Sequence, residues 1–446
     1  MHIIALLQRH CRWALASLAC ALLLSGCDLD DLLEAKDPFT VTPETASDTA
    51  NLQTLYAGSR SQFALAFGGL QNNEGGIVLM SGLMSDELYS SDNFGTRRAV
   101  DSRNIDYQIS NSASDHAFIY LQRARAEALN AIDLFEDSPR AGQAQHAELY
   151  SIAGYSVLML VENFCAGIPL SRITQTGVEF GSPLNRNELY DLAIAYFDQA
   201  LAQPDADAAQ LNLARVGKAR ALLGLGRQAD AAQVVANVPT DFEFSIEYAA
   251  GSFETPNPVF NLINEEHRIS ASIQEGTVNR GLPFGAQPRD PRIAIANQSV
   301  ASNSGEVPNW MQLKYTSQDD EIPLATGVEA RLIQAEAQLA NGTSASYLAT
   351  LNALRTPAGL AQLTDPGPAA GRVDQFFAER AYWLWLTGHR LNDMRRLVRQ
   401  YGRSQETVFP TGVTPYGIQY GTAVSLPIPF EEINNPNYEV CTDRGA

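Results

Sequence analysis

Amphipathic segments that follow one another in pairs, joined by short turns, constrain the fold of this chain more than any other feature. Apolar residues recur at three- and four-residue steps across 114–135 and across 142–163. The turns between such segments contain glycine or asparagine, as in Gly224-Leu225-Gly226 and Asn341-Gly342. A helix with one apolar face must bury that face against a neighbour. The chain is therefore predicted to be dominated by α-helices in antiparallel pairs.

Two of these pairs resemble tetratricopeptide units. From Ala219 to Pro239 a helix of small residues is followed by a glycine turn, a second helix and a proline, and 330–355 is similar. Such units cannot bury their apolar faces alone, so several must stack into a superhelix. The repeats are degenerate and interrupted. Further helices are expected at 45–67, 187–202, 208–225, 228–237, 326–340, 344–354, 371–387 and 388–401.

Irregular segments separate and follow the helices. The stretch 241–321 is rich in Gly, Pro, Asn and Ser, which predicts an insertion with a few short strands. Residues 406–446 form a Pro-rich tail, and 90–111 is expected to be a long loop. The predicted organisation is one domain over 45–446, with helical scaffold at 45–240 and 325–401.

The N-terminus has the pattern of a secretory signal over residues 1–26. A basic start precedes an apolar run at 13–24 that is too short to span a bilayer. Leu24-Ser25-Gly26-Cys27 then resembles a bacterial lipobox, which implies cleavage before Cys27 and its acylation. Residues 27–44 would form an acidic tether between membrane and domain. The alternative is an ordinary secreted protein with an unmodified Cys27.

Composition excludes some partners. The formal net charge is −19, and cleavage of the signal would remove two arginines and no acidic residue. An acidic surface does not bind nucleic acid, whose phosphates require basic residues. It also does not dock electrostatically on anionic lipid, so the lipid chain must be the anchor.

Three of the five cysteines remain after cleavage, namely Cys27, Cys165 and Cys441. With Cys27 acylated, Cys165 and Cys441 are a candidate disulfide in an exported protein, the alternative being two free thiols.

The sequence contains no set of residues typical of an active site. Motifs of the HExxH, GxSxG, Walker and CxxC types are absent, and the histidines are scattered. The string that begins at Gly224 has a GxGxxA pattern, but a helix precedes it, which favours a helix–helix turn over a dinucleotide site. We therefore expect no metal, no cofactor and no catalysis.

Ligand binding has candidates in a carboxylate pair and in aromatics beside loops. Adjacent carboxylates point in different directions on a helix, which favours a structural role for the pair over glycoside hydrolysis. Aromatic rings stack on sugars or grip apolar peptide side chains, or else they pack the loops onto the scaffold. The candidates are Asp86, Glu87, Tyr89, Phe94, Phe284 and Trp310.

The end of the predicted scaffold has a buried stripe and a cluster of charges. The stripe consists of Phe377, Ala381, Leu384, Gly388 and Leu391. Asp393 lies three residues from both Arg390 and Arg396, which predicts an ion-paired helix end.

Short motifs in a characteristic order resemble the RagB/SusD family of outer-membrane nutrient-uptake lipoproteins. The motifs are Ser85-Asp86-Glu87, Asp290-Pro291-Arg292, Ile322-Pro323-Leu324, "EARLIQAEAQLAN" at 329–341, Glu379-Arg380, Gly388-His389-Arg390, Asp393, Arg395-Arg396, Leu426-Pro427-Ile428-Pro429, Glu432 and Asn434-Asn435-Pro436-Asn437. The resemblance implies an α-α superhelix of tetratricopeptide-like pairs with an irregular, loop-rich layer that faces the substrate.

The same resemblance implies a function. The protein would capture a glycan, oligosaccharide or peptide at the cell surface and deliver it to a SusC-like TonB-dependent transporter, on which it would sit as a lid. It would be anchored by lipid (palmitate) on Cys27 in the outer membrane and face outward. The binding residues would lie within 85–94 and 255–315. Two alternatives remain open, an envelope scaffold that binds protein partners and a lipoprotein glycosidase.

Overall fold

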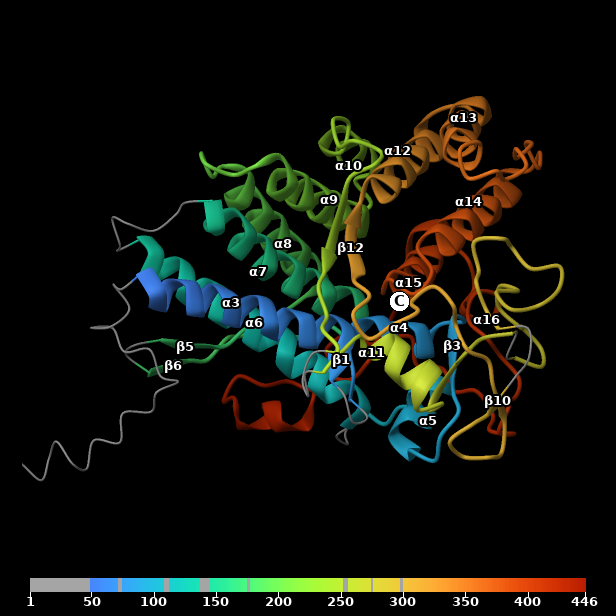
Figure 1. Ribbon diagram of the computed structural model, residues 1–446, viewed down its shortest axis with the longest axis horizontal. Coiled ribbons are helices and arrows are strands. Elements are labelled where there is room, and N and C mark those ends of the chain that lie inside the picture. Colours follow the sequence, from blue (N-terminus) through green and yellow to red (C-terminus); the bar gives the residue numbers. More distant parts are fainter. Residues whose placement is uncertain are drawn as a thin grey trace, which may run out of the picture. The chain divides into compact units, whose positions relative to one another are not determined.

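The computed structural model describes residues 49–70, 74–107, 112–136, 144–174, 177–251, 256–273, 276–296 and 300–446 (Figure 1). By its contacts the chain divides into Met1–Asn51 and the compact unit Leu52–Ala446. Of the first unit only 49–51 are described. The predicted signal peptide, the acylated Cys27 and the acidic tether lie outside the described residues.

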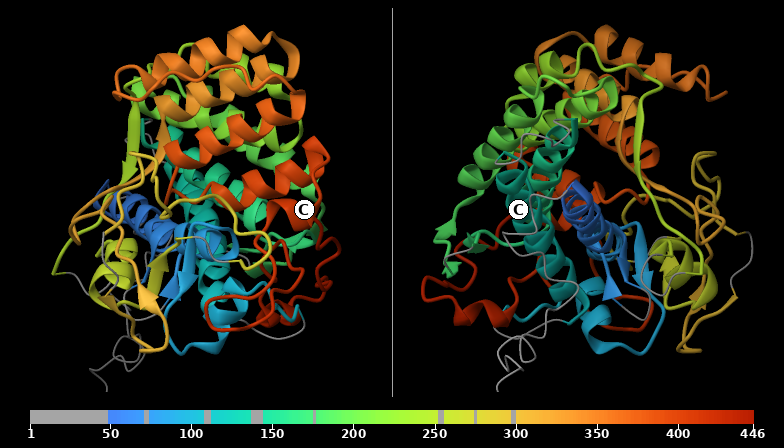
Figure 2. Two further views of the ribbon diagram at one scale, coloured as in Figure 1. Left: turned by 90° about the vertical axis from the view of Figure 1, so that its right-hand side faces the viewer. Right: turned by 60° about the vertical axis from the view of Figure 1, so that its left-hand side comes forward.

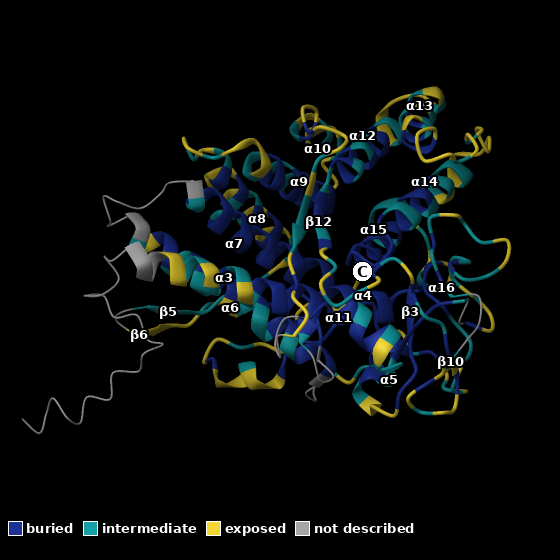
Figure 3. Ribbon diagram, in the orientation of Figure 1, coloured by how far each residue is buried: buried dark blue, intermediate teal, exposed yellow. Residues whose placement is uncertain are grey.

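Three helices come from the N-terminal part of the compact unit. They are α3 Thr49–Gly68, α4 Ile77–Met84 and α5 Gly95–Asp101. All residues of α4 are buried, and its sequence carries no charge (Figure 3). A helix that is apolar all round belongs inside a core, and α4 lies there because its sequence leaves no polar face for water.

A stack of helices then follows the sequence order. The helices are α6 Ser112–Glu136, α7 Ala144–Asn163, α8 Arg186–Leu201, α9 Ala208–Gly224 and α10 Gln228–Val234. Each packs on the next one along the chain (Figures 1 and 2). Capping boxes start two of them, since Asn185 pairs with Glu188 and Asp207 pairs with Gln210. Gly226, with φ +74°, makes the predicted turn between α9 and α10.

A second group of helices lies beside this stack. It consists of α12 Gly327–Asn341, α13 Ser344–Arg355, α14 Ala369–Trp383, α15 Arg390–Tyr401 and the short α16 Gln405–Val408. The two groups are joined where α12 packs on α9 and α10, and where α15 packs on α4 and α7 (Figure 1). The helices therefore form one continuous scaffold.

Short antiparallel strand pairs join the remaining segments. The pairs are β1 Gly69–Leu70 with β2 Glu74–Gly75, β3 Leu88–Ser90 with β9 Ile269–Ala271, β4 Ile168–Pro169 with β7 Pro183–Leu184, β5 Arg172–Thr174 with β6 Gly177–Glu179, β8 Glu243–Ile246 with β12 Ile322–Thr326, and β10 Val300–Ala301 with β11 Pro308–Asn309. The chain also forms short helical turns at α11 Pro258–Phe260, η1 Asn261–Glu265 and η2 Phe430–Asn434. The predicted fold class, a helical scaffold with an irregular layer, is confirmed.

The predicted disulfide is present. Cys165, just beyond α7, is bonded to Cys441 in the C-terminal tail, with their Cα atoms 5.5 Å apart. Backbone hydrogen bonds flank it, because Ala166 N donates to Asp443 O and Thr442 N donates to Ala166 O, both at 2.9 Å. The tail is thereby held against the segment that follows the C-terminal end of α7.

Charged residues of the sequence motifs form a buried network between α12, α14 and α15. Glu329 Oε1 lies 3.0 Å from His389 Nε2, and Arg380 Nε donates to Asp393 Oδ2 at 2.7 Å. Burial acts to raise the pKa of Glu329, but the neighbouring His389 and Arg220 lower it below its ordinary value. These motif residues hold helices together, and each charge has its partner inside the protein.

Two details of the sequence prediction are wrong. The expected loop 90–111 contains α5, and most of its described residues are at least half-buried because Asp92 and Arg97 pair in the interior. The helix predicted from Gly388 starts only at Arg390, since Gly388 has φ +76° and turns the chain. The predicted ion-paired helix end is present, because Asp393 pairs with Arg396 and with Arg380, while Arg390 pairs with Asp86.

Candidate ligand-binding site

Most of the predicted ligand-binding residues are interior. Asp86, Glu87, Tyr89 and Phe284 are each at most 2% exposed. Trp310 is half-buried, and Phe94 is 41% exposed. Of the six, only Phe94 and Trp310 therefore present part of a ring to the surface.

Asp86 acts as a link between distant segments. Its carboxylate accepts two hydrogen bonds from Arg390, at 2.6 and 2.8 Å, and a third from Leu282 N at 2.8 Å. It lies at the wall of a polar cavity of about 360 Å³ that also contacts the Asp374–Arg403 ion pair. Because both oxygens of Asp86 are engaged, its position fixes α15 against the loop at Leu282.

Glu87 faces the interior. Its Oε1 accepts a hydrogen bond from Leu386 N at 3.1 Å. Burial raises the pKa of Glu87 to about 8, so the group retains its proton near neutral pH. A neutral carboxyl here has a packing role, and it leaves no charge for a ligand to contact.

Strand pairing brings the aromatic candidates into one region. Tyr89 stands opposite Ser270 in the β3–β9 pair, and its hydroxyl donates to Pro308 O. Trp310 N donates to Ser270 Oγ at 2.7 Å, and Ala271 N donates to Trp310 O at 2.9 Å. The segments that carry Tyr89 and Trp310 thus flank the same strand, β9.

The chain that leaves β3 presents Phe94 at the start of α5. Asp92 is buried and organises this turn, since its Oδ1 accepts from Phe94 N at 3.0 Å and its Oδ2 pairs with Arg97. The guanidinium carbons of Arg97 and Arg268 lie 5.3 and 5.7 Å from the centre of the Phe94 ring. An exposed ring is therefore held in place by the buried Arg97 and the half-buried Arg268.

A second aromatic residue, Tyr416, is linked to the segment of Phe94 through Arg98 and Asp92. The Arg98 guanidinium carbon is 3.6 Å from the centre of the Tyr416 ring, and Arg98 Nη2 donates to Glu306 Oε2 at 3.2 Å. The Tyr416 hydroxyl donates to Asp92 O at 3.2 Å. We call Phe94, Arg98, Arg268, Glu306 and Tyr416 the Phe94 cluster.

The Phe94 cluster combines what a polar, ring-shaped ligand requires. It offers exposed aromatic surface together with guanidinium donors and a carboxylate acceptor whose side chain is 55% exposed. The positive charges of Arg268 and Arg98 are balanced by ion pairs with Glu266 and Glu306, so the cluster has no large excess charge. This arrangement suits hydrogen bonding to hydroxyl groups beside a stacking face, and it contains no nucleophile–base pair among its described residues.

The sequence suggested Phe94 as a candidate but not the residues that surround it in the Phe94 cluster. Arg268, Glu306 and Tyr416 come from three segments far apart in the sequence, in the insertion and in the tail. None has a local motif. Only the pairing of β3 with β9 and the contact of the tail at Tyr416 bring them to Phe94, and a single sequence carries no sign of either.

Among the described residues, no helix has both the length and the apolarity needed to cross a bilayer. The same part of the chain holds no group of three or more His, Cys, Asp or Glu side chains arranged for a metal ion.

Comparison with known proteins identifies the architecture. No protein-family model matches the chain, and no curated protein matches it in sequence. Solved structures do match. A SusD-like protein from Bacteroides fragilis is 14% identical, with a TM-score of 0.67 over 90% of this chain and 98% of its own. Surface glycan-binding protein A from Bacteroides uniformis is 13% identical, with a TM-score of 0.65 over 88% and 99%.

A third neighbour is a SusD superfamily protein from Bacteroides vulgatus, 15% identical with a TM-score of 0.61 over 89% of this chain and 99% of its own. At such identities the likeness concerns the fold, and it extends over nearly the whole length of each neighbour. The resemblance seen in the sequence motifs is confirmed at that level: the chain has the SusD-like fold.

Proposed function

We propose that this protein is a surface lipoprotein that binds carbohydrate at the Phe94 cluster, without catalysing a reaction, and delivers it to a TonB-dependent transporter. The observation that carries the proposal is Phe94 itself, a 41% exposed ring fixed by a buried Asp92–Arg97 pair and surrounded by polar side chains. A structural neighbour described as a surface glycan-binding protein supports this ligand class. The lipobox at Cys27 supports an outward-facing lipid anchor in the outer membrane.

The Phe94 proposal is tested by measuring affinity for a panel of soluble oligosaccharides with the purified full chain. Phe94→Ala is expected to weaken the best binder about tenfold, because the stacking surface is lost. Phe180→Ala is the matched control, since Phe180 is 48% exposed and lies outside the cluster. Equal affinities for wild type and Phe94→Ala would remove the cluster from the binding site.

A second surface supports the transporter part of the proposal. Val178, Phe180, Phe430 and Ile433 are 48–54% exposed, and Asn437 Nδ2 donates to Phe180 O at 3.4 Å, which joins the β6 region to the tail. We call these four residues the Phe430 patch. Uncovered apolar side chains on segments that contact one another are typical of protein–protein contacts.

Co-purification tests the partner. The tagged full chain, extracted from its native envelope in mild detergent, is expected to bring a large β-barrel transporter with it. A Phe430→Ser/Ile433→Ser double variant should recover less of that barrel, while Phe94→Ala should recover it fully. If no barrel accompanies the wild type under detergents that preserve such complexes, a free-standing binding protein or an envelope scaffold takes the place of the lid.

A further inference from the structure

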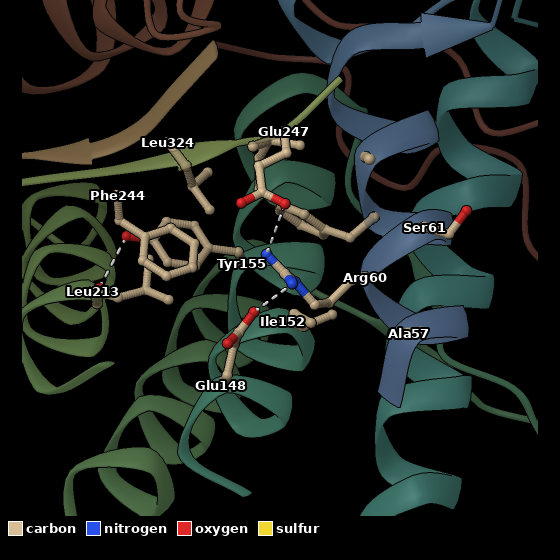
Figure 4. A pocket seen from close by; sticks show the side chains of 13 residues that line it. Ala57, Arg60, Ser61, Glu148, Ile152, Tyr155, Leu213, Phe244, Glu247 and Leu324 are labelled. Carbon is tan, nitrogen blue, oxygen red and sulfur yellow. Dashed lines mark hydrogen bonds and ion pairs between the residues drawn. The ribbon is translucent and has the colours of Figure 1, made fainter. Parts of the chain in front are cut away.

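A pocket on the helical scaffold lies between α3, α7 and the β8–β12 pair (Figure 4). Its volume is about 190 Å³. The walls are apolar and come from five elements, contributed by Phe63, Ile152, Tyr155, Leu213, Phe244 and Leu324. The Tyr155 hydroxyl donates to Leu213 O at 3.0 Å, so it offers no free donor to a ligand inside.

Charged side chains gather at one side of this pocket. Arg60 lies between two carboxylates, with its Nε 3.0 Å from Glu148 Oε1 and its Nη2 3.8 Å from Glu247 Oε2 (Figure 4). The other oxygen of Glu148 accepts from the Tyr56 hydroxyl at 2.5 Å. Both oxygens of Glu148 are therefore acceptors, as in an ionised carboxylate.

Glu247 differs from Glu148 in its surroundings. Its side chain is 70% exposed, against 10% for Glu148, and its contact with Arg60 is long. One guanidinium and two carboxylates leave this side of the pocket with one net negative charge. The unbalanced charge resides on Glu247, within reach of solvent and of anything that enters.

We infer that the pocket binds a short apolar group that carries a primary ammonium, with the apolar part among Phe63, Tyr155 and Leu324 and the ammonium beside Glu247. An apolar cavity of about 150 Å³ accommodates benzene, so the volume here suits one phenyl ring or a short branched chain. A carboxylate on the same group would face two glutamates and only one guanidinium, which Glu148 already pairs at 3.0 Å, and a hydroxyl would gain no ion pair. The site is separate from the proposed glycan site and uses none of the same residues.

Two sources share this chemistry, a free aryl or alkyl amine and the N-terminal residue of a peptide. Phenethylamine represents the first, and the tripeptide Phe-Gly-Gly, compared with its N-acetyl form, represents the second. Binding of phenethylamine alone assigns a small amine. Binding of both, with loss on acetylation, assigns a peptide N-terminus.

Calorimetry on the purified full chain tests the ligand class. Phenethylamine is expected to bind, 2-phenylethanol to bind about fivefold more weakly, and 3-phenylpropionate more weakly still. Equal affinity for the amine and the alcohol would overturn the ammonium assignment. Absence of amine binding up to about 10 mM would overturn the site.

Variants locate the binding. Glu247→Gln should reduce the affinity for phenethylamine to that for 2-phenylethanol, whereas Glu243→Gln, an exposed carboxylate on the same β8 segment outside this pocket, should leave it unchanged. Ala57→Phe places a ring at an exposed position of the pocket wall and should abolish binding. Unchanged thermal unfolding and unchanged oligosaccharide binding in these variants show that neither the fold nor the Phe94 cluster is involved. Equal effects of Glu247→Gln and Glu243→Gln would contradict the proposal.

Discussion

Glu87 is a carboxyl group whose folded environment favours the proton. Burial raises its pKa from 4.5 to about 8, while in the unfolded chain it titrates near its ordinary value. Between these two pH values the folded protein holds a proton that the unfolded chain has released. The free energy of unfolding must therefore fall as pH rises through this window, by about 1.4 kcal/mol per pH unit from this group.

The substitution Glu87→Gln tests whether Glu87 causes this pH dependence of the unfolding free energy. The amide oxygen can still accept from Leu386 N, but the side chain no longer titrates. Urea unfolding between about pH 5 and pH 8 should show wild type losing stability relative to Glu87→Gln as pH rises. Asp101, whose pKa burial also raises to about 8, is present in both proteins, so its effect cancels in the difference. Parallel pH profiles would show that Glu87 is ionised in the folded state.

Asp86 is expected to matter for folding. Asp86→Ala leaves Arg390 buried without its carboxylate, which should lower the free energy of unfolding by about 3–5 kcal/mol. Asp230→Ala is the control, because the Arg227–Asp230 pair is about half exposed and should contribute less than about 1 kcal/mol. Urea unfolding of both variants decides the point, and similar small losses would contradict the structural role.

At the scale of residues, the sequence predicted the structural role of one candidate pair but not the partners of that pair. The structural reading of the Asp86-Glu87 pair agrees with the burial of both, but their partners could not be predicted, because Arg390 and Leu386 are about 300 residues away. The exposure of the aromatic candidates could not be predicted from the sequence either. Nothing local distinguishes Phe94, at the surface, from Phe284, which is fully buried against Tyr382.

At the scale of elements, close helix packing depends on small residues. Gly217 in α9 faces an aromatic pair, Tyr155 and Phe197, whose ring centres are 5.0 Å apart. A Cβ at position 217 would overlap the Phe197 ring and lie 2.9 Å from Tyr155 Cζ. Gly217→Ala should therefore destabilise the protein by about 1–3 kcal/mol, although alanine favours the helix.

Gly58→Ala is the matched comparison for that substitution. Gly58 also lies inside a helix, but the nearest atom to an added Cβ is Glu127 Oε2 at 3.7 Å. Here the gain in helix propensity should prevail, with a stabilisation of up to about 1 kcal/mol. Thermal unfolding distinguishes the two substitutions by opposite shifts, and shifts of the same sign would contradict close packing at Gly217.

The spacing of apolar residues predicted the long helices because each of them has apolar residues repeated along one face. The segment 208–225 matches α9, and 344–354 matches α13, within one residue at each end. It missed α5, whose seven residues, GTRRAVD, contain one large apolar side chain and no repeat. Short strands were expected within 241–321, but their positions and pairing could not be predicted, since segments of two to five residues hold little periodicity and their partners are distant.

At the scale of the whole chain, the Phe94 cluster exists only when insertion, tail and scaffold are assembled together. Arg268 reaches it through the β3–β9 pair, and Tyr416 reaches it from the tail. The sequence motifs predicted the assembly as a fold, because their charges meet in the buried network around Glu329. The motifs did not predict which loop residues meet at the surface. The buried network constrains only the helices, and the loops are positioned by other contacts that have no sequence motif.

The disulfide gives the tail its anchor. It joins residues 276 apart in sequence, so it restricts the unfolded chain strongly, and Cys441→Ser should lower the free energy of unfolding by about 2–5 kcal/mol. The loss should also be local. Amide exchange at Ala166 and Thr442, whose hydrogen bonds flank the bond, should accelerate more than exchange in α9.

Two controls separate the disulfide from the substituted side chain. Cys165→Ser removes the same bond from the other end and should give the same loss, and wild type treated with a thiol reductant should match both. Tyr416 belongs to the same tail, but its hydroxyl is held by hydrogen bonds to Ser304 and Asp92. These hydrogen bonds do not depend on the disulfide. Oligosaccharide binding should therefore persist in Cys441→Ser under conditions where the protein stays folded. If binding were lost together with the disulfide, the tail would be positioned at the Phe94 cluster by Cys441 and not by the contacts of Tyr416.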